Sequence, residues 1–153
     1  MTRPRPAAFS LIELVLTTLI VGLLAAVAVP RYAQASANVR LDAAARRVAT
    51  DLKHAADLAR TRSGPVVIGF NQITDQVSIF YVDPGPTTVT ASLTELGGPP
   101  YRVSIVSADF NGVGLLGFDG FGQPEFGGTV TLRAGGRELM LNVDAATGEV
   151  VSP

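Results

Sequence analysis

A single acidic side chain lies inside an otherwise uncharged apolar run: Glu13, near the start of the segment Phe9–Val29. A carboxylate at the centre of a bilayer costs about 2.5–3.5 kcal/mol, and less near the edge, so acids inside membrane segments tend to be paired or functional. Glu13 is only about one helical turn into the run, and a side chain there can also reach interfacial water. On the residues alone, both interpretations of Glu13 stay open.

The other side chains that could do chemistry do not form a catalytic set. His54 is the sole histidine and the chain has no cysteine, so His54 beside Lys53 completes neither a metal site nor a nucleophile–base pair. Asp109–Gly112 and Asp119 offer oxygen atoms for a weak calcium site, but they lack the spaced acids and bidentate glutamate of a dedicated loop. Turn formation by these side chains is the favoured interpretation. Without a phosphate-binding loop or paired carboxylates, the sequence predicts no enzyme, no catalytic residue, no cofactor and no metal.

A long helix is predicted to hold the N-terminal half of these residues. As a helix, Phe9–Val29 would cover about 30 Å, the thickness of a bilayer's hydrocarbon core. Gly64–Pro65 is a stop signal, so we predict one helix from Phe9 to Arg62, about 80 Å long and bent at Pro30. Beyond Pro30, apolar residues follow the three-and-four spacing of an amphipathic helix: Leu41, Ala45, Val48, Leu52, Ala55 or Ala56, and Ala59. The predicted opposite face carries Arg40, Arg46, Arg47, Asp51, Lys53, Asp57 and Arg60.

After Gly64, short runs of alternating apolar and polar residues are separated by glycine and proline, which indicates β-strands. The predicted strands are 66–71, 76–82, 101–107, 113–118, 129–133, 138–143 and 149–151. In 101–107, one face is predicted to carry Tyr101, Val103, Ile105 and Ser107. Gly135–Gly136 closes a tight hairpin, whereas Thr87–Pro100 is predicted as a loop that includes at most a short edge strand. The predicted fold class is α+β: a long N-terminal helix packed on a C-terminal antiparallel β-domain of about six or seven strands.

Length and charge limit the organisation and the partners. Of 153 residues, about 120 remain beyond the apolar segment, which suits one compact domain. The formal net charge is −1, and without residues 1–8 ten basic residues face 13 acidic ones, giving −3, so no general attraction for polyanions is expected. Arg3 and Arg5, before the apolar segment, favour a cytoplasmic N-terminus. The basic residues after the segment favour the opposite orientation: Arg31, Arg40, Arg46 and Arg47. We predict that the C-terminal domain lies outside the cytoplasmic membrane.

The N-terminus resembles the type III signal of type IV pilins and type II secretion pseudopilins. The match is the cationic leader MTRPRPAA, then the aromatic Phe9 and Glu13 four residues later, with Gly22 in the span and Pro30 at a helix-bending position. The resemblance implies that a prepilin peptidase cleaves between Ala8 and Phe9 and methylates Phe9, although the family usually has glycine where this chain has Ala8. It also implies assembly roles for Glu13 and Pro30. Glu13 would pair with the cationic N-terminus of a neighbouring subunit in an apolar filament core.

The C-terminal region resembles one branch of this family, the GspH/FimT type of minor pseudopilin. The similarity rests on Gly117–Pro124, the hairpin that follows it, and Thr147–Val150 near the end of the chain. It implies four regions: a leader peptide at 1–8, a transmembrane and filament-core helix at 9–29, its amphipathic continuation at 30–62, and a β-rich pseudopilin domain at 63–153.

The function implied by the resemblance is that of a minor pseudopilin, a structural subunit of the type II secretion pseudopilus involved in protein export across the outer membrane. The implied partners are other pseudopilins or pilins, contacted through the N-terminal helix, together with the prepilin peptidase and the secretion platform. The implied location is the inner membrane, crossed once, with a periplasmic C-terminal domain that is assembled into the pseudopilus.

Two other functions stay open. One is a minor type IV pilin of the FimT type, serving pilus assembly or DNA uptake; the other, from a different class, is a membrane-anchored extracytoplasmic binding or enzymatic domain. Some FimT-type pilins bind DNA through arginines near the C-terminus, where phosphate contacts would form. This chain has no basic residue after Arg137, and Arg133 and Arg137 alone would make a thin patch. The sequence therefore does not favour nucleic acid as a partner.

Overall fold

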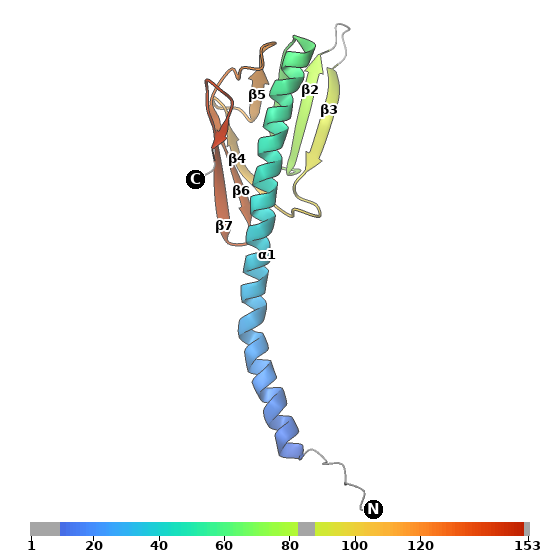
Figure 1. Ribbon diagram of the computed structural model, residues 1–153, viewed down its shortest axis with the longest axis vertical. Coiled ribbons are helices and arrows are strands. Elements are labelled where there is room, and N and C mark those ends of the chain that lie inside the picture. Colours follow the sequence, from blue (N-terminus) through green and yellow to red (C-terminus); the bar gives the residue numbers. More distant parts are fainter. Residues whose placement is uncertain (1–9, 83–87, 152–153) are drawn as a thin grey trace, which may run out of the picture. The chain divides into compact units, whose positions relative to one another are not determined.

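The computed structural model describes residues 10–82 and 88–151, and its first element is the helix α1, Leu11–Arg62 (Figure 1). The chain divides into two units, Met1–Ser36 and Ala37–Pro153, and α1 contributes residues to both. The predicted helix is thus confirmed from Leu11 onward and ends at the predicted residue, Arg62. Phe9, where the prediction began, lies outside the described residues.

The C-terminal end of α1 is a Schellman motif. The Gly64 N–H donates to the Ala59 carbonyl and the Ser63 N–H to the Arg60 carbonyl, both at 3.2 Å. Ser63 has a left-handed φ of 50°, so the residue that turns the chain is the one before the predicted stop. These two bonds satisfy carbonyl groups that the helix leaves without a partner, and the chain then turns into the first strand.

Two four-stranded antiparallel sheets follow α1. Their strand orders are β3–β2–β1–β5 and β4–β6–β7–β8. The strands are β1 Val66–Asn71, β2 Gln76–Val82, β3 Thr88–Glu95, β4 Ser104–Asp109, β5 Leu115–Phe118, β6 Gly128–Ala134, β7 Arg137–Val143 and β8 Val150–Val151. The predicted fold class, a long N-terminal helix on an antiparallel β-domain, is confirmed, with eight strands in the described residues where about six or seven were predicted.

The extra strand is β3, which lies in the stretch predicted as a loop or short edge strand. It has eight residues and pairs along the whole of β2, with a register shift between Ile79 and Phe80. Because β3 is the edge of its sheet, it needs a partner on one side only, and threonine is well suited to strands. Composition alone therefore underestimated its length.

The strand β4 begins three residues later than predicted, at Ser104. A β-bulge between Ile105 and Ser107 shifts its register against β6, and a bulge moves the following side chains to the other face. Of the face predicted to carry Ser107, Val103 and Ile105 are buried, and Ala108 rather than Ser107 continues the buried set.

The core of the unit Ala37–Pro153 joins α1 to both sheets. The apolar helix positions predicted from spacing, Leu41, Ala45, Val48, Leu52 and Ala59, are all buried, and both Ala55 and Ala56 join them. The alanines of this face let the strands approach the helix closely. The β-domain contributes Phe118 from β5 and the stacked pair Phe70, from β1, and Phe110, which follows β4; the ring centroids of the pair are 5.6 Å apart.

Candidate functional site

Glu13 lies in the first turn of α1 with its side chain exposed. The Ser10 carbonyl accepts hydrogen bonds from the N–H groups of Glu13 (3.1 Å) and Leu14 (3.2 Å), which makes Ser10 the N-cap residue, directly before the first residue of α1. Ser10 and Glu13 therefore have the spacing of a capping box, S-x-x-E. The sequence reasoning did not consider this spacing, which offers Glu13 a place in the cap of α1.

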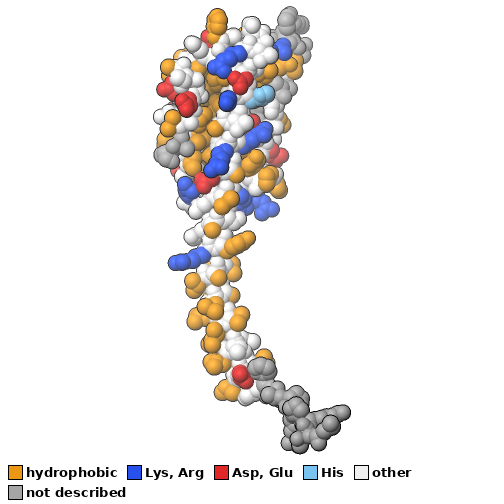
Figure 2. Space-filling view, viewed as in Figure 1, with side chains coloured by type: hydrophobic (Ala, Val, Ile, Leu, Met, Phe, Trp, Pro, Cys, Tyr) orange, Lys and Arg blue, Asp and Glu red, His pale blue; other side chains and the backbone are white. Residues whose placement is uncertain are grey.

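The helix around Glu13 presents apolar side chains in every direction. Within the unit Met1–Ser36, the exposed large apolar residues are Leu11, Ile12, Leu14, Val15, Leu16, Leu19, Ile20, Val21, Leu23, Leu24, Val27, Val29 and Tyr32, and Figure 2 shows such side chains along this part of α1. The segment is long and apolar enough to cross a membrane. An apolar surface of this extent is stable only in contact with lipid or with other apolar helices, so the segment is a candidate membrane anchor.

The other predicted assembly and processing residues have different outcomes. Pro30 lies inside α1, which stays helical across it. A proline at this position removes the hydrogen bond to the carbonyl four residues earlier and favours a bend. Ala8 and Phe9, the predicted cleavage site, lie outside the described residues, so cleavage and methylation stay predictions.

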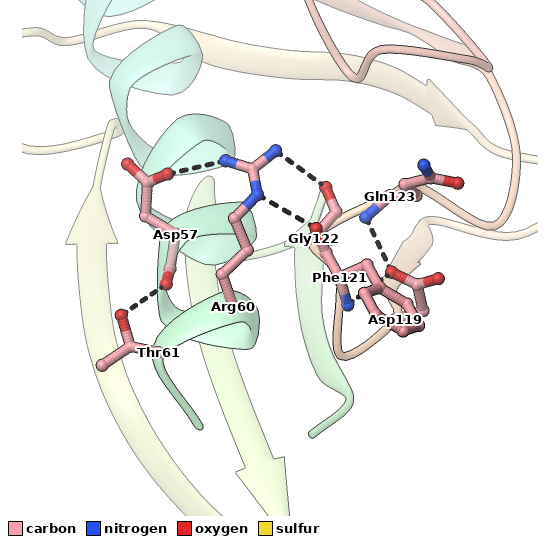
Figure 3. Close-up of polar contacts among 7 residues, drawn as sticks. All are labelled: Asp57, Arg60, Thr61, Asp119, Phe121, Gly122 and Gln123. Atoms are coloured by element: carbon pink, nitrogen blue, oxygen red, sulfur yellow. Dashed lines mark hydrogen bonds and ion pairs between the residues drawn. The ribbon is translucent and has the colours of Figure 1, made fainter. Parts of the chain in front are cut away.

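The segment Gly117–Pro124, which carries part of the family resemblance, docks on the end of α1 (Figure 3). Arg60 donates from Nε to the Phe121 carbonyl at 3.0 Å and from Nη1 to Asp57 Oδ1 at 2.9 Å. Asp119 Oδ1 accepts from the N–H groups of Phe121 (3.0 Å) and Gln123 (2.8 Å), which closes the loop on itself. The role of Asp119 is therefore that of a turn residue, as predicted.

Gly122 shows why this loop needs a glycine. It has a φ of +72°, and a Cβ there would lie 2.6 Å from the Ala56 carbonyl oxygen on α1. Any other residue would be strained in its backbone and would push the loop away from the helix. The motif thus serves to close the domain against α1.

Asp51 corrects the predicted polar face of the helix, because this residue is only 3% exposed. Its Oδ1 lies 3.1 Å from Arg47 Nε, and Arg47 Nη2 donates to Thr94 Oγ1 on β3 at 3.0 Å. A buried carboxylate needs a partner, and the i,i+4 spacing provides one in Arg47. The helical pattern alone could not show that β3 contacts α1 on this side.

The residues that the sequence offered as candidates for metal binding have no metal-binding arrangement in the described residues. His54 is exposed on α1, and Asp109 Oδ1 accepts a hydrogen bond from the Gly112 N–H at 2.7 Å, forming the predicted turn. Among the described residues, no group of three or more His, Cys, Asp or Glu side chains could hold a metal ion.

The two arginines that flank the hairpin turn form ion pairs. Arg133 Nε donates to Glu138 Oε1 at 2.8 Å, across β6 and β7, and Arg137 Nη1 lies 3.3 Å from Asp42 Oδ1 on α1. The charge of each is therefore partly neutralised within the domain, which reduces its attraction for phosphate groups.

The turn before β8 is organised by Asp144. Its Oδ1 accepts from the N–H groups of Thr147 (2.8 Å) and Ala146 (2.9 Å) and from the Thr147 hydroxyl (3.0 Å). The backbone N–H of Thr147, then that of Ala146, then the Thr147 hydroxyl hold the pKa of this carboxyl below its ordinary value, because each bond favours the charged form.

We expect the contribution of Asp144 to stability to depend on pH. Because the folded-state pKa is lowered, this contribution is fully present above the unfolded pKa and is lost as the pH falls through the folded pKa. The melting temperature of wild type should exceed that of Asp144→Ala at pH 7, and the difference should shrink as the pH falls through the lowered folded-state pKa of Asp144. Asp144→Asn, which keeps an oxygen acceptor but no charge, is the control. A difference that stayed constant down to the lowest accessible pH would contradict this assignment.

The sequence matches no known protein-family model and no curated protein. Two solved structures resemble the fold, both of the type IV minor pilin FimU of Pseudomonas aeruginosa strain PAO1, in crystal forms P21 and P65. Their TM-scores are 0.57 and 0.55, each at 16% sequence identity, and the matches cover 76% and 74% of this chain and 90% and 92% of the FimU chains. The likeness is one of fold: the chain has a type IV pilin-like architecture, as the sequence resemblance predicted.

Proposed function

We propose that this chain is a structural subunit of a pilin-like filament, and more specifically a minor pseudopilin of a type II secretion pseudopilus. The observation that carries the proposal is α1, whose N-terminal part exposes apolar side chains around one acid, Glu13. The same helix continues into a domain with the fold of a type IV minor pilin. A helix of this kind suits a protein that is held in a membrane and then assembled by helix packing.

In the proposed mechanism, the chain is inserted in the inner membrane with its domain in the periplasm. The prepilin peptidase cleaves between Ala8 and Phe9 and methylates Phe9. The helix then moves from lipid into the filament. Lipid tails are as apolar as leucine, so this transfer gains little from apolar burial. Charge pairing between Glu13 and the N-terminal amine of a neighbouring subunit then supplies the specificity, because it sets the register of the two helices.

A second candidate function is that of a minor type IV pilin, since both structures that resemble this fold are of such a pilin. Filament assembly through α1 would be the same in either machine. DNA uptake is not favoured, because Arg133 and Arg137 are engaged with Glu138 and Asp42. The partners of the assembled subunit therefore distinguish the two machines.

In-cell crosslinking should identify those partners. A photoreactive amino acid in place of Val21, which is 64% exposed on α1, should crosslink to other type II pseudopilins and to the secretion platform. Crosslinks to a major pilin would assign the chain to a type IV pilus instead. In cells that lack the prepilin peptidase, crosslinks to filament subunits should disappear. If the probe crosslinked to neither a pseudopilin nor a pilin in cells with the prepilin peptidase, the structural-subunit proposal would fail. The chain would then be a membrane-anchored binding or enzymatic domain.

A further inference from the structure

A cleft runs between α1 and the strands β7 and β8, inside the unit Ala37–Pro153. It consists of a hollow of about 210 Å³ bounded by α1, Leu139 and Leu141, and a second of about 380 Å³ beside the turn that leads to β8. Ala49 and Val150 line both hollows, so the two adjoin. We call this surface the α1–β7 cleft.

Within the described residues, the cleft lies at a sheet edge that is only partly paired. The strand β8 has two residues and pairs only with Asn142 and Val143 of β7. Along the rest of β7, the described residues provide no strand partner on that side, while β6 pairs with β7 along its whole length. A row of unpaired backbone groups is a template for a further strand.

The geometry of the hairpin shows which backbone groups face the open edge. Ala134 and Arg137 are opposite each other across a two-residue turn, which makes them a hydrogen-bonded pair. Hydrogen bonding alternates along an antiparallel pair, so the N–H and C=O groups of Glu138 and Met140 point away from β6. These are the groups that an added strand would meet.

The walls of the cleft combine small and apolar side chains. On α1 the lining includes Ala45, Ala49 and Ala56, and on β7 it includes Leu139 and Leu141. Alanine side chains leave the space between helix and sheet edge unfilled. The inward side chains of an added strand would therefore reach an apolar floor.

The rim of the cleft is basic. Arg46, Lys53 and Arg60 line it at intervals of seven residues on α1, which is about 10.5 Å at helical rise, and Figure 2 shows basic side chains along this part of the helix. Arg60 is paired with Asp57, whereas Arg46 and Lys53 have no ion-pair partner in the part of the chain that the structure describes. Arg137 adds a fourth basic side chain to the lining of the cleft, which also includes two acids, Asp42 and Glu149.

We propose that the α1–β7 cleft binds an extended, acidic polypeptide segment of a partner protein, which adds as a strand to the open edge of β7. The sheet edge supplies main-chain hydrogen bonds, the alanine and leucine walls receive alternate apolar side chains, and Arg46 and Lys53 attract the acidic ones. An unpaired strand edge selects a polypeptide over a nucleic acid. The proposal is independent of the machine in which the subunit works.

The test uses the purified full-length chain in detergent and a fluorescent eight-residue peptide of alternating valine and glutamate. We expect this peptide to bind with a Kd below about 1 mM, and the same peptide with lysine in place of glutamate to bind at least tenfold more weakly. The Ala49→Phe variant should fill both hollows and weaken binding about tenfold or more, while Ala43→Phe, at an exposed position of the same helix, should bind like wild type. The double variant Arg46→Glu, Lys53→Glu should reverse the preference between the two peptides.

Amide hydrogen exchange tests strand addition directly. Bound peptide should slow exchange at Glu138 and Met140, the two groups assigned to the open edge, in wild type and in Ala43→Phe. Binding without protection of these amides would overturn the strand mechanism. Absence of binding by the acidic peptide, equal binding of both peptides, or binding of a DNA duplex in preference to the acidic peptide would overturn the proposal, whatever filament the chain belongs to.

Discussion

Replacing Glu13 with alanine should leave the chain in the membrane and reduce its recovery in filaments by about a hundredfold or more. If Glu13 pairs with the cationic N-terminus of a neighbouring subunit, the variant leaves that charge unpaired in an apolar core, which costs about 3–5 kcal/mol. The measurement is the fraction of the chain in sheared filaments relative to the membrane fraction. Mass spectrometry should find a mature chain that begins with methylated Phe9 in both wild type and variant.

Two control variants separate charge pairing from helix capping. Glu13→Gln keeps the S-x-x-E/Q pattern of a capping box but removes the charge, so it should fail like Glu13→Ala. Thr17→Ala removes a different polar group from the same apolar segment, the hydroxyl that donates to the Leu14 carbonyl, and should assemble normally. Wild-type incorporation of Glu13→Gln would show that the carboxylate acts locally on α1, and would contradict the proposed pairing.

Replacing Phe118 with alanine should destabilise the β-domain by about 3–5 kcal/mol, the usual cost of removing a buried phenylalanine side chain. Phe118 is 1% exposed on β5, where it is opposite Val66 and part of the core that joins the sheets to α1. Domains of this size have about 5–15 kcal/mol of stability, so the loss is a large share of the total. Pulse proteolysis of the full-length chain in increasing urea would measure this loss of stability, because cleavage of the β-domain depends on its unfolding and not on the helical state of the membrane segment.

Phe121 is a matched control for this variant. It lies three residues further on, in the loop that docks on Arg60, but its side chain is 80% exposed. Arg60 bonds to the Phe121 carbonyl, not to its ring, so Phe121→Ala should change stability by no more than about 0.5 kcal/mol. Equal effects of the two substitutions would mean that Phe118 does not lie in the core.

The α1–β7 cleft shows how far the sequence could lead to a candidate site. The seven-residue spacing of Arg46, Lys53 and Arg60 is visible in the sequence, where these residues belong to the predicted polar face of the helix. Such a face is ordinarily just solvated. That it forms the rim of a cleft depends on β7 lying beside it and on β8 pairing only with Asn142 and Val143 among the described residues. Neither is encoded in the helical pattern.

The elements with a local pattern could be predicted from the amino-acid sequence alone. The apolar run with Glu13, the helical spacing from Leu41 to Ala59, and the first two strands follow from which side chains must leave water, and a short window of the sequence shows each of these patterns. The resemblance at Glu13 and Gly117–Pro124 also led to the type IV pilin-like architecture, which the fold comparison supports. Cleavage between Ala8 and Phe9 and the assembly role of Glu13 stay predictions.

Tertiary contacts determine which polar groups are buried, where the strand register shifts, and which sheet edges stay open among the described residues. Asp51 has the pattern of a solvent-facing residue, yet it is buried beside Arg47, which also bonds to Thr94 of β3. The bulge in β4 and the full length of β3 depend on their partner strands, β6 and β2. Contacts of this kind join residues far apart in the chain, so their free energies are set by packing and by the satisfaction of hydrogen bonds, which no local period of the sequence records.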